Sequence, residues 1–186
     1  MKPALPVKAI DMDALTAFLE DFHKESDRAV AIVGAAKCDL LLFQLLQRAL
    51  LPCTGNRDEL LEGDSPLGSF SARIQLAHRL GLIDDQYARA LHILRRLRNG
   101  FAHEPASSAL TAASHRDRVR ELVAPFAPYK QFDSHLKLIK EVSDPRRDFL
   151  GALEVMIGRL DQLVASVEQV SPRLMQPLIP PHWERT

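Results

Sequence analysis

Residues 91–105 read Leu-His-Ile-Leu-Arg-Arg-Leu-Arg-Asn-Gly-Phe-Ala-His-Glu-Pro and are the most informative stretch of the chain. Leu91, Leu94 and Phe101 recur at helical spacing and predict the apolar face of a helix. Arg98, seven residues after Leu91, falls almost on the same line, so its guanidinium is predicted to point toward the core. Because arginine stays charged in proteins, Arg98 would then need hydrogen-bond acceptors, a pocket or a subunit interface.

The other face of this predicted helix is polar. It carries His92, Arg96, Asn99 and His103. The helix is expected to end near His103, because Pro105 disfavours helical backbone in the residue before it. Gly100 already weakens the last turn.

Length and composition predict an all-α protein with a single-domain bundle of about six helices. The 186 residues are 46% hydrophobic but only 6% aromatic, and leucine, alanine, arginine and glutamate dominate the periodic segments. We expect a loose lead-in over residues 1–10, the bundle over residues 11–170 and an extended, proline-rich tail over residues 171–186.

Apolar periodicity and capping residues predict the individual helices. In chain order they are expected over 11–24, 27–51, 69–80, 84–103 and 116–126, with a last long helix from 144, whereas 125–134 is expected to be irregular. The helix over 27–51 is apolar nearly all the way round, which predicts neighbours on several sides. The regular spacing of the last helix fits either closure of the bundle or part of a dimer seam.

Charge is balanced overall but not locally. The chain has 24 basic and 24 acidic residues, so no whole-molecule field attracts nucleic acid. Residues 71–120, however, contain nine arginines and four acidic residues. This excess fits a solvated surface or a binding patch equally well. The candidate binding residues are Arg89, His92, Arg95 and Arg96.

A helix-turn-helix spacing is present, but its details disfavour DNA binding. Ala77, Gly81 and Tyr87 stand where two crossing helices and their turn would need them. Asp84 and Asp85 would meet the DNA first, and carboxylates at that point repel phosphate. A helix pair packed within a bundle is the favoured interpretation.

Several classes of site have no sequence signal. The chain has no glycine-rich phosphate loop, metal-ligand cluster or nucleophile elbow, so we expect no cofactor and no metal.

Cys38 and Cys53 lack paired spacing and fit reduced thiols of a cytoplasmic protein. No signal peptide is apparent, and charges interrupt the apolar run 29–51, which predicts a buried helix and no membrane span. No sequence pattern assigns a role to His78, His92 or His115, and all three are expected at the surface or an interface.

Arg98, Asn99 and His103 form the candidate catalytic set. An arginine can hold a phosphate with two hydrogen bonds, a histidine can transfer protons near neutral pH, and the asparagine can orient an oxygen. Together they would suffice for metal-independent RNA cleavage by attack of the 2′-hydroxyl. In the structural alternative, Arg98 bonds carbonyl groups of a neighbouring helix and His103 closes its own helix end.

Two blocks, residues 67–83 and 91–103, resemble the mannitol operon repressor family of bacteria, with the likeness extending over about residues 27–105. That resemblance implies an all-helical, oligomeric transcriptional regulator that acts through a partner and lacks a DNA-binding element of its own.

Residues 98–103 are also similar to the signature of HEPN domains, bundles that dimerise and in many members cleave RNA. On that resemblance Arg98 would bind phosphate, Asn99 would orient and His103 would transfer protons, in a site shared by two protomers. Gly100 departs from the larger, often acidic residue expected there.

The sequence therefore predicts a cytoplasmic repressor-like transcription regulator that is a homodimer and acts through contacts with a protein partner, without enzymatic activity. The alternative is a metal-independent endoribonuclease or toxin that uses Arg98 and His103 in a dimeric site, with RNA as its partner. Direct DNA binding ranks third.

Overall fold

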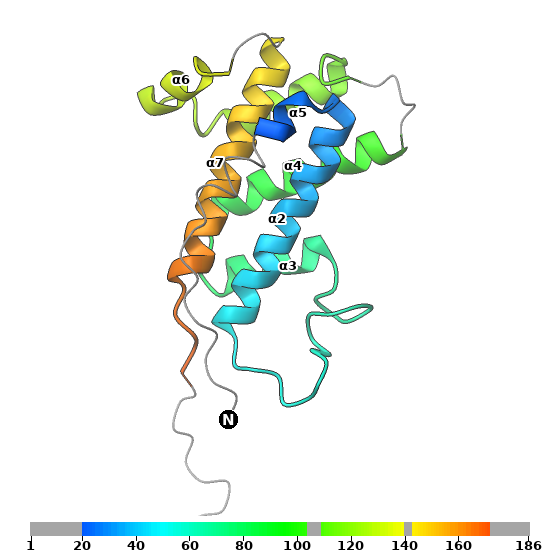
Figure 1. Cartoon of the computed structure of the whole chain (residues 1–186), viewed down its shortest axis with the longest axis vertical. Coiled ribbons are helices and arrows are strands. Elements are labelled where there is room, and N and C mark those ends of the chain that lie inside the picture. The colour runs from blue at the N-terminus through cyan, green and yellow to red at the C-terminus, as the bar shows by residue number, and fades with distance from the viewer. Residues whose placement is uncertain (1–19, 104–108, 140–142, 172–186) are drawn as a thin grey trace, which may run out of the picture.

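The computed structural model describes residues 20–103, 109–139 and 143–171, and all regular structure in them is helical (Figure 1). In chain order the helices are α2 (Asp27–Ala49), α3 (Phe70–Arg79), α4 (Asp85–His103), α5 (Ala113–Val123), α6 (Lys130–Leu136) and α7 (Asp144–Ser166). A helical stretch over residues 20–24 precedes α2. The predicted all-α, single-domain bundle is confirmed.

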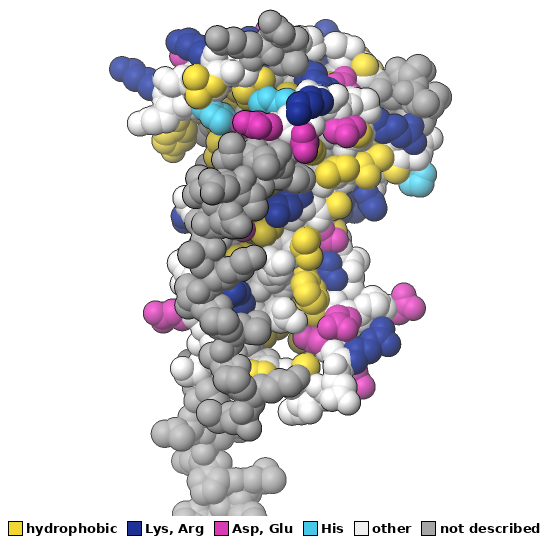
Figure 2. Space-filling model, in the orientation of Figure 1, with side chains coloured by type: hydrophobic (Ala, Val, Ile, Leu, Met, Phe, Trp, Pro, Cys, Tyr) yellow, Lys and Arg dark blue, Asp and Glu magenta, His cyan; other side chains and the backbone are white. Residues whose placement is uncertain are grey.

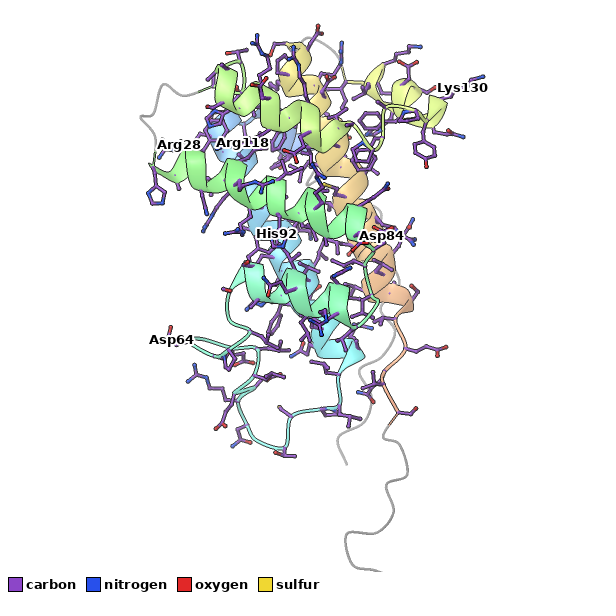
Figure 3. The ribbon with its side chains drawn as sticks, turned by 180° about the vertical axis from the view of Figure 1, so that it is seen from behind. Arg28, Asp64, Asp84, His92, Arg118 and Lys130 are labelled. Atoms are coloured by element: carbon purple, nitrogen blue, oxygen red, sulfur yellow. The ribbon has the colours of Figure 1, made fainter. Side chains whose placement is uncertain are left out.

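The two long helices, α2 and α7, run side by side in the same direction (Figure 1). Contacts at both ends fix this orientation. At their start, Arg146 Nη1 donates to Asp27 Oδ1 over 2.6 Å, and past their end the Val170 amide donates to the Ala49 carbonyl over 2.7 Å. Helices α3, α4 and α5 form a second layer behind this pair and lie across it (Figure 3).

The core lies between the two layers. Its fully buried side chains include Leu42 and Leu45 from α2, Leu94 and Leu97 from α4, and Phe149, Leu153, Ile157 and Leu160 from α7. Burying each such side chain stabilises the fold by about 1.5–3 kcal/mol. The regular apolar face of α7 packs against α2, α5 and α6, so it closes the bundle and does not form an external dimer seam.

Glycine is required where α2 crosses α7. A Cβ on Gly34 would lie 2.4 Å from Cδ2 of Leu153 and 3.0 Å from Cζ of Phe22. Both neighbours are buried, so neither can easily move away. The missing side chain lets the two helices approach closely.

Helix α2 has neighbours on more than one side, as its nearly all-round apolar character predicts. It packs against α7 beside it and against α3 and α4 behind it, while Val33 and Leu40 are 42% and 49% exposed. Among the described helices, α2 alone is long and apolar enough to cross a membrane, judged by length and composition, and half of its most apolar window is buried in the bundle.

Several predicted helix boundaries are confirmed. The side chains of Ser69 and Asp84 cap the starts of α3 and α4, and Pro145 lies in the first turn of α7. Gly81 adopts a left-handed φ of 71° after α3, as expected for a glycine that ends a helix. The predicted lead-in, most of the first predicted helix and the tail from residue 172 lie outside the described residues.

Two boundary predictions are wrong. Helix α5 begins at Ala113, whereas Arg116 was expected to start it. Residues 130–136 form α6, where the sequence predicts irregular structure. This seven-residue helix is too short to be stable alone, and it is held by Phe132, which is buried and stacks on Phe126 with ring centroids 5.3 Å apart.

Arg73 explains part of the local excess of arginine. Its guanidinium donates to Asp39 Oδ1 over 2.7 Å and to the carbonyls of Leu61 and Leu67 over 3.0 and 3.1 Å. It also lies 5.2 Å from the ring centroid of Phe43. Arg73 therefore ties the loop before α3 to α2 and is a structural residue.

Candidate functional site

The candidate binding residues lie on α4, in the outer layer of the bundle. Figure 3, seen from behind, shows α5, α4 and α3 as neighbouring helices, with Arg118 on α5 and His92 on α4. Arg89 and Arg96 are exposed, whereas His92 and Arg95 are half-buried. The spacing of three and four residues from Arg89 to His92 to Arg96 keeps these side chains on one face.

Glu121 of α5 links the two exposed arginines of this face. Arg89 donates to Glu121 Oε1 through Nε over 3.1 Å and through Nη2 over 2.8 Å. Nη2 of Arg96 lies 4.0 Å from the same oxygen. Each of these groups is more than a third exposed to water, so the ion pairs contribute under about 1 kcal/mol to stability. Their main effect is to place two guanidinium groups around one carboxylate, which leaves a net positive charge.

His92 is held neutral within this cationic surface. Partial burial lowers the pKa of its imidazole below 6.5, and the charges of Arg95 and Arg96 lower this pKa further. At neutral pH His92 therefore offers one hydrogen-bond donor and one acceptor without a charge. We call the surface formed by Arg89, His92, Arg96 and Glu121 the α4–α5 face.

The expectation that Arg98 points toward the core is wrong. Its side chain is exposed, and Nη1 donates to Oδ1 of Asn99 over 3.1 Å. The buried face of α4 centres on Leu94, Leu97 and Phe101, and position 98 lies at the edge of that face. A long arginine at such an edge can carry its charged end into water.

Arg98 and His103 do not form one site in the single chain. Both are exposed, and α4 continues through Gly100 to His103 as predicted. Five residues apart on a helix, they point about 140° away from each other. Asn99 is half-buried and engaged by Arg98. Their catalytic role remains a prediction that needs a second copy to supply the other half of the site.

His115 is a second correction, because it is fully buried and not at the surface. Its ring stacks on Phe101 with centroids 4.2 Å apart and planes inclined by 23°. Its Nδ1 lies 3.1 Å from the carbonyl oxygen of Ala109. His115 therefore packs the start of α5 against the end of α4, which positions the α4–α5 face.

A cluster around Glu154 has no signal in the sequence. This glutamate of α7 is 8% exposed, and its Oε1 contacts Nε2 of His23. Its Oε2 lies 2.8 Å from Nε2 of His135 on α6. The cluster joins three separate segments. No set of three metal-ligating side chains able to hold an ion occurs in the part of the chain that the structure describes.

A cavity of about 930 Å³ opens at the far end of α2, between residues 47–60 and 167–170. Its wall includes two arginines, Arg48 and Arg57, and three acidic residues, Asp58, Glu59 and Glu168. Charges of both signs and an apolar remainder do not select one class of ligand. The cavity therefore does not identify a substrate.

Comparisons with known proteins give one similarity of fold. No family model and no curated protein matches the sequence. The chain is similar to a chain of the X-ray structure of the MtlR-HPr complex from Escherichia coli, with 22% sequence identity and a TM-score of 0.49. The match covers 80% of this chain and 96% of that chain. It brings no support for the HEPN resemblance of residues 98–103, and at this identity the likeness concerns the fold alone.

Proposed function

We propose that this protein is a regulator that acts by binding an acidic partner protein through the α4–α5 face. The observation that carries the proposal is the pairing of Arg89 and Arg96 with the single carboxylate of Glu121, beside the neutral imidazole of His92. Helices α4 and α5 together carry seven arginines and three acidic residues. A partner carboxylate would find unsatisfied positive charge there and a hydrogen-bond donor between the charges.

The same face is poorly suited to DNA. Glu121 stands between the two arginines, and Asp85 begins α4, so carboxylates lie where phosphates would have to approach. The α3–α4 pair is also packed into the bundle, because the Tyr87 hydroxyl donates to the Met156 carbonyl of α7 over 2.5 Å. The resemblance of residues 67–83 and 91–103 to mannitol operon repressors supports transcription regulation through such a partner.

A photoreactive amino acid at position 96 tests the proposal in living cells, with position 159 on α7 as the matched exposed control. The expected result is a protein adduct from position 96 only. The protein so identified is then titrated calorimetrically with the purified chain. The double variant Arg89→Glu with Arg96→Glu is expected to weaken that binding at least tenfold, whereas Arg159→Glu leaves it unchanged. Adducts to nucleic acid alone, or binding unaffected by the double variant, would overturn the proposal.

A further inference from the structure

The cavity at the far end of α2 has an apolar wall that is open to water. Its lining includes Leu51, Leu60 and Val170, whose side chains are 49%, 45% and 44% exposed. They are three of the nine large hydrophobic side chains that are exposed among the described residues, so these side chains gather here. Figure 2 shows hydrophobic side chains at the lower end of the described chain, near where α2 ends in Figure 1. Clustered apolar exposure of this kind is typical of a binding site.

The chain itself brings a segment to this cavity. After α7 it runs past the end of α2, where the Val170 amide donates to the Ala49 carbonyl over 2.7 Å and the Gln169 side chain donates to the Leu50 carbonyl over 3.0 Å. Residues 167–170 thereby form part of the cavity wall, and residues 172–186, which we call the tail, continue from it. A short connection of this kind gives an effective concentration of about millimolar. A contact too weak to form between separate molecules can therefore form here.

The tail is richer in apolar residues than a segment that stays in water. Solvated segments have low hydrophobicity and few aromatic residues. Five large apolar residues occur in the tail, namely Leu174, Met175, Leu178, Ile179 and Trp183. Four prolines lie among them and restrict the free chain, so less entropy is lost when the tail is held in place.

The order of residues in the tail fits an extended segment with two apolar sides. A proline-rich chain in the polyproline II conformation turns once every three residues, so positions three apart lie on the same side. One row consists of Leu174, Pro177, Pro180 and Trp183, and the next of Pro172, Met175, Leu178 and Pro181. The third row is mainly polar and consists of Arg173, Gln176, Ile179 and His182. Such a segment can lie against an apolar wall with its polar side in water.

We propose that the cavity is the binding site of this chain's own tail, with Trp183 packed against Leu51, Leu60 and Val170. The cavity volume of about 930 Å³ is near the upper end of the range of about 300–1,000 Å³ for ligand pockets, so several side chains of the tail fit into it. The contact is independent of the proposed function, because no residue of α4 or α5 lines the cavity.

The charges of the wall and the tail are also complementary. The wall has three acidic and two basic residues and therefore one net negative charge. The tail has two arginines, Arg173 and Arg185, and one acidic residue, Glu184, and therefore one net positive charge. Opposite charges of this kind favour the docked arrangement over one in which the tail extends away.

Tryptophan fluorescence of the full chain tests the contact, because Trp183 is the single tryptophan of the sequence. The expected acrylamide quenching constant is several-fold smaller than that of a synthetic peptide of residues 172–186. Leu51→Asp should raise it to the value of the peptide, since the variant places a charge in the apolar wall. Leu138→Asp, at a 75% exposed leucine outside the cavity, is the matched control and should leave it unchanged. Quenching as strong as in the peptide, or shielding unaffected by Leu51→Asp, would overturn the proposal.

The thiol of Cys53 tests the same contact from the wall of the cavity. Cys53 is half-buried and lines the cavity, whereas Cys38 is buried in the core. A small thiol reagent should modify Cys53 several-fold faster in Trp183→Asp than in the unchanged chain, because the tail no longer covers the wall. Gln176→Asp adds the same charge to the polar row and should leave the rate unchanged. Equal rates in all three chains would overturn the proposal. Rates that depend on protein concentration over a hundredfold range would also overturn it, because the tail would then come from another copy.

Discussion

Replacing Gly34 by alanine separates the effect of packing from the effect of helix propensity. An alanine within a helix is favoured over glycine by about 1 kcal/mol. At position 34, however, the added Cβ would lie 2.4 Å from Leu153 Cδ2 and 3.0 Å from Phe22 Cζ. Forcing a methyl group into a packed core costs about 1–3 kcal/mol. After the gain of about 1 kcal/mol in helix propensity is subtracted, we expect Gly34→Ala to destabilise the protein by up to about 2 kcal/mol net.

Gly158 of α7 is the matched control, because it is also within a helix but has no atom within 4 Å of the added Cβ. Gly158→Ala should therefore stabilise the protein by about 0.5–1 kcal/mol. Urea unfolding followed by circular dichroism at 222 nm measures both changes from the shift of the midpoint at constant slope. If Gly34→Ala proved as stabilising as Gly158→Ala, the close contact between α2 and α7 would be refuted.

Three further predictions concern the candidate site and the thiols. RNA incubated with the protein in EDTA should remain intact, since the proposed function uses the α4–α5 face to bind a protein and gives Arg98 and His103 no role in catalysis. Cleavage abolished by either alanine substitution would establish the ribonuclease alternative. The imidazole of His92 should titrate with a pKa below 6.5 when it is followed by NMR. Its contribution to the free energy of unfolding is therefore present above pH 6.5 and decreases as the pH falls through that lowered pKa. The variant His92→Gln should remove this pH dependence. Burial raises the pKa of Cys38 to about 12, so a thiol reagent at pH 8 should modify Cys53 alone in the folded protein; rapid modification of two thiols would contradict this.

The local signals of the chain determined most helix boundaries. Ser69 and Asp84 cap their helices, Gly81 ends one with a positive φ, and Pro145 starts another, because each of these preferences acts within a few residues of backbone. The spacing of apolar residues likewise determined that the protein is a helical bundle.

Tertiary structure alone decided α6 and the composition of the candidate site. Residues 130–136 are helical because Phe132 is buried against other parts of the bundle, and no local preference signals that burial. Glu121 joins the site because α5 packs beside α4. Glu154 of α7 contacts His23 because helix packing brings together two segments that are 131 residues apart in sequence.

Arg98 shows where periodicity stops being informative. Helical spacing gave its angle on α4 but not the width of the buried face, which depends on the helices that cover it. Since the covered face centres on Leu94, Leu97 and Phe101, a side chain at its edge can reach water. The sequence by itself thus determined most of the helical segments, with α6 as the exception, and most of the apolar residues that face inward along them. Only packing between helices decided which side chains meet, because those contacts join residues that are distant along the chain.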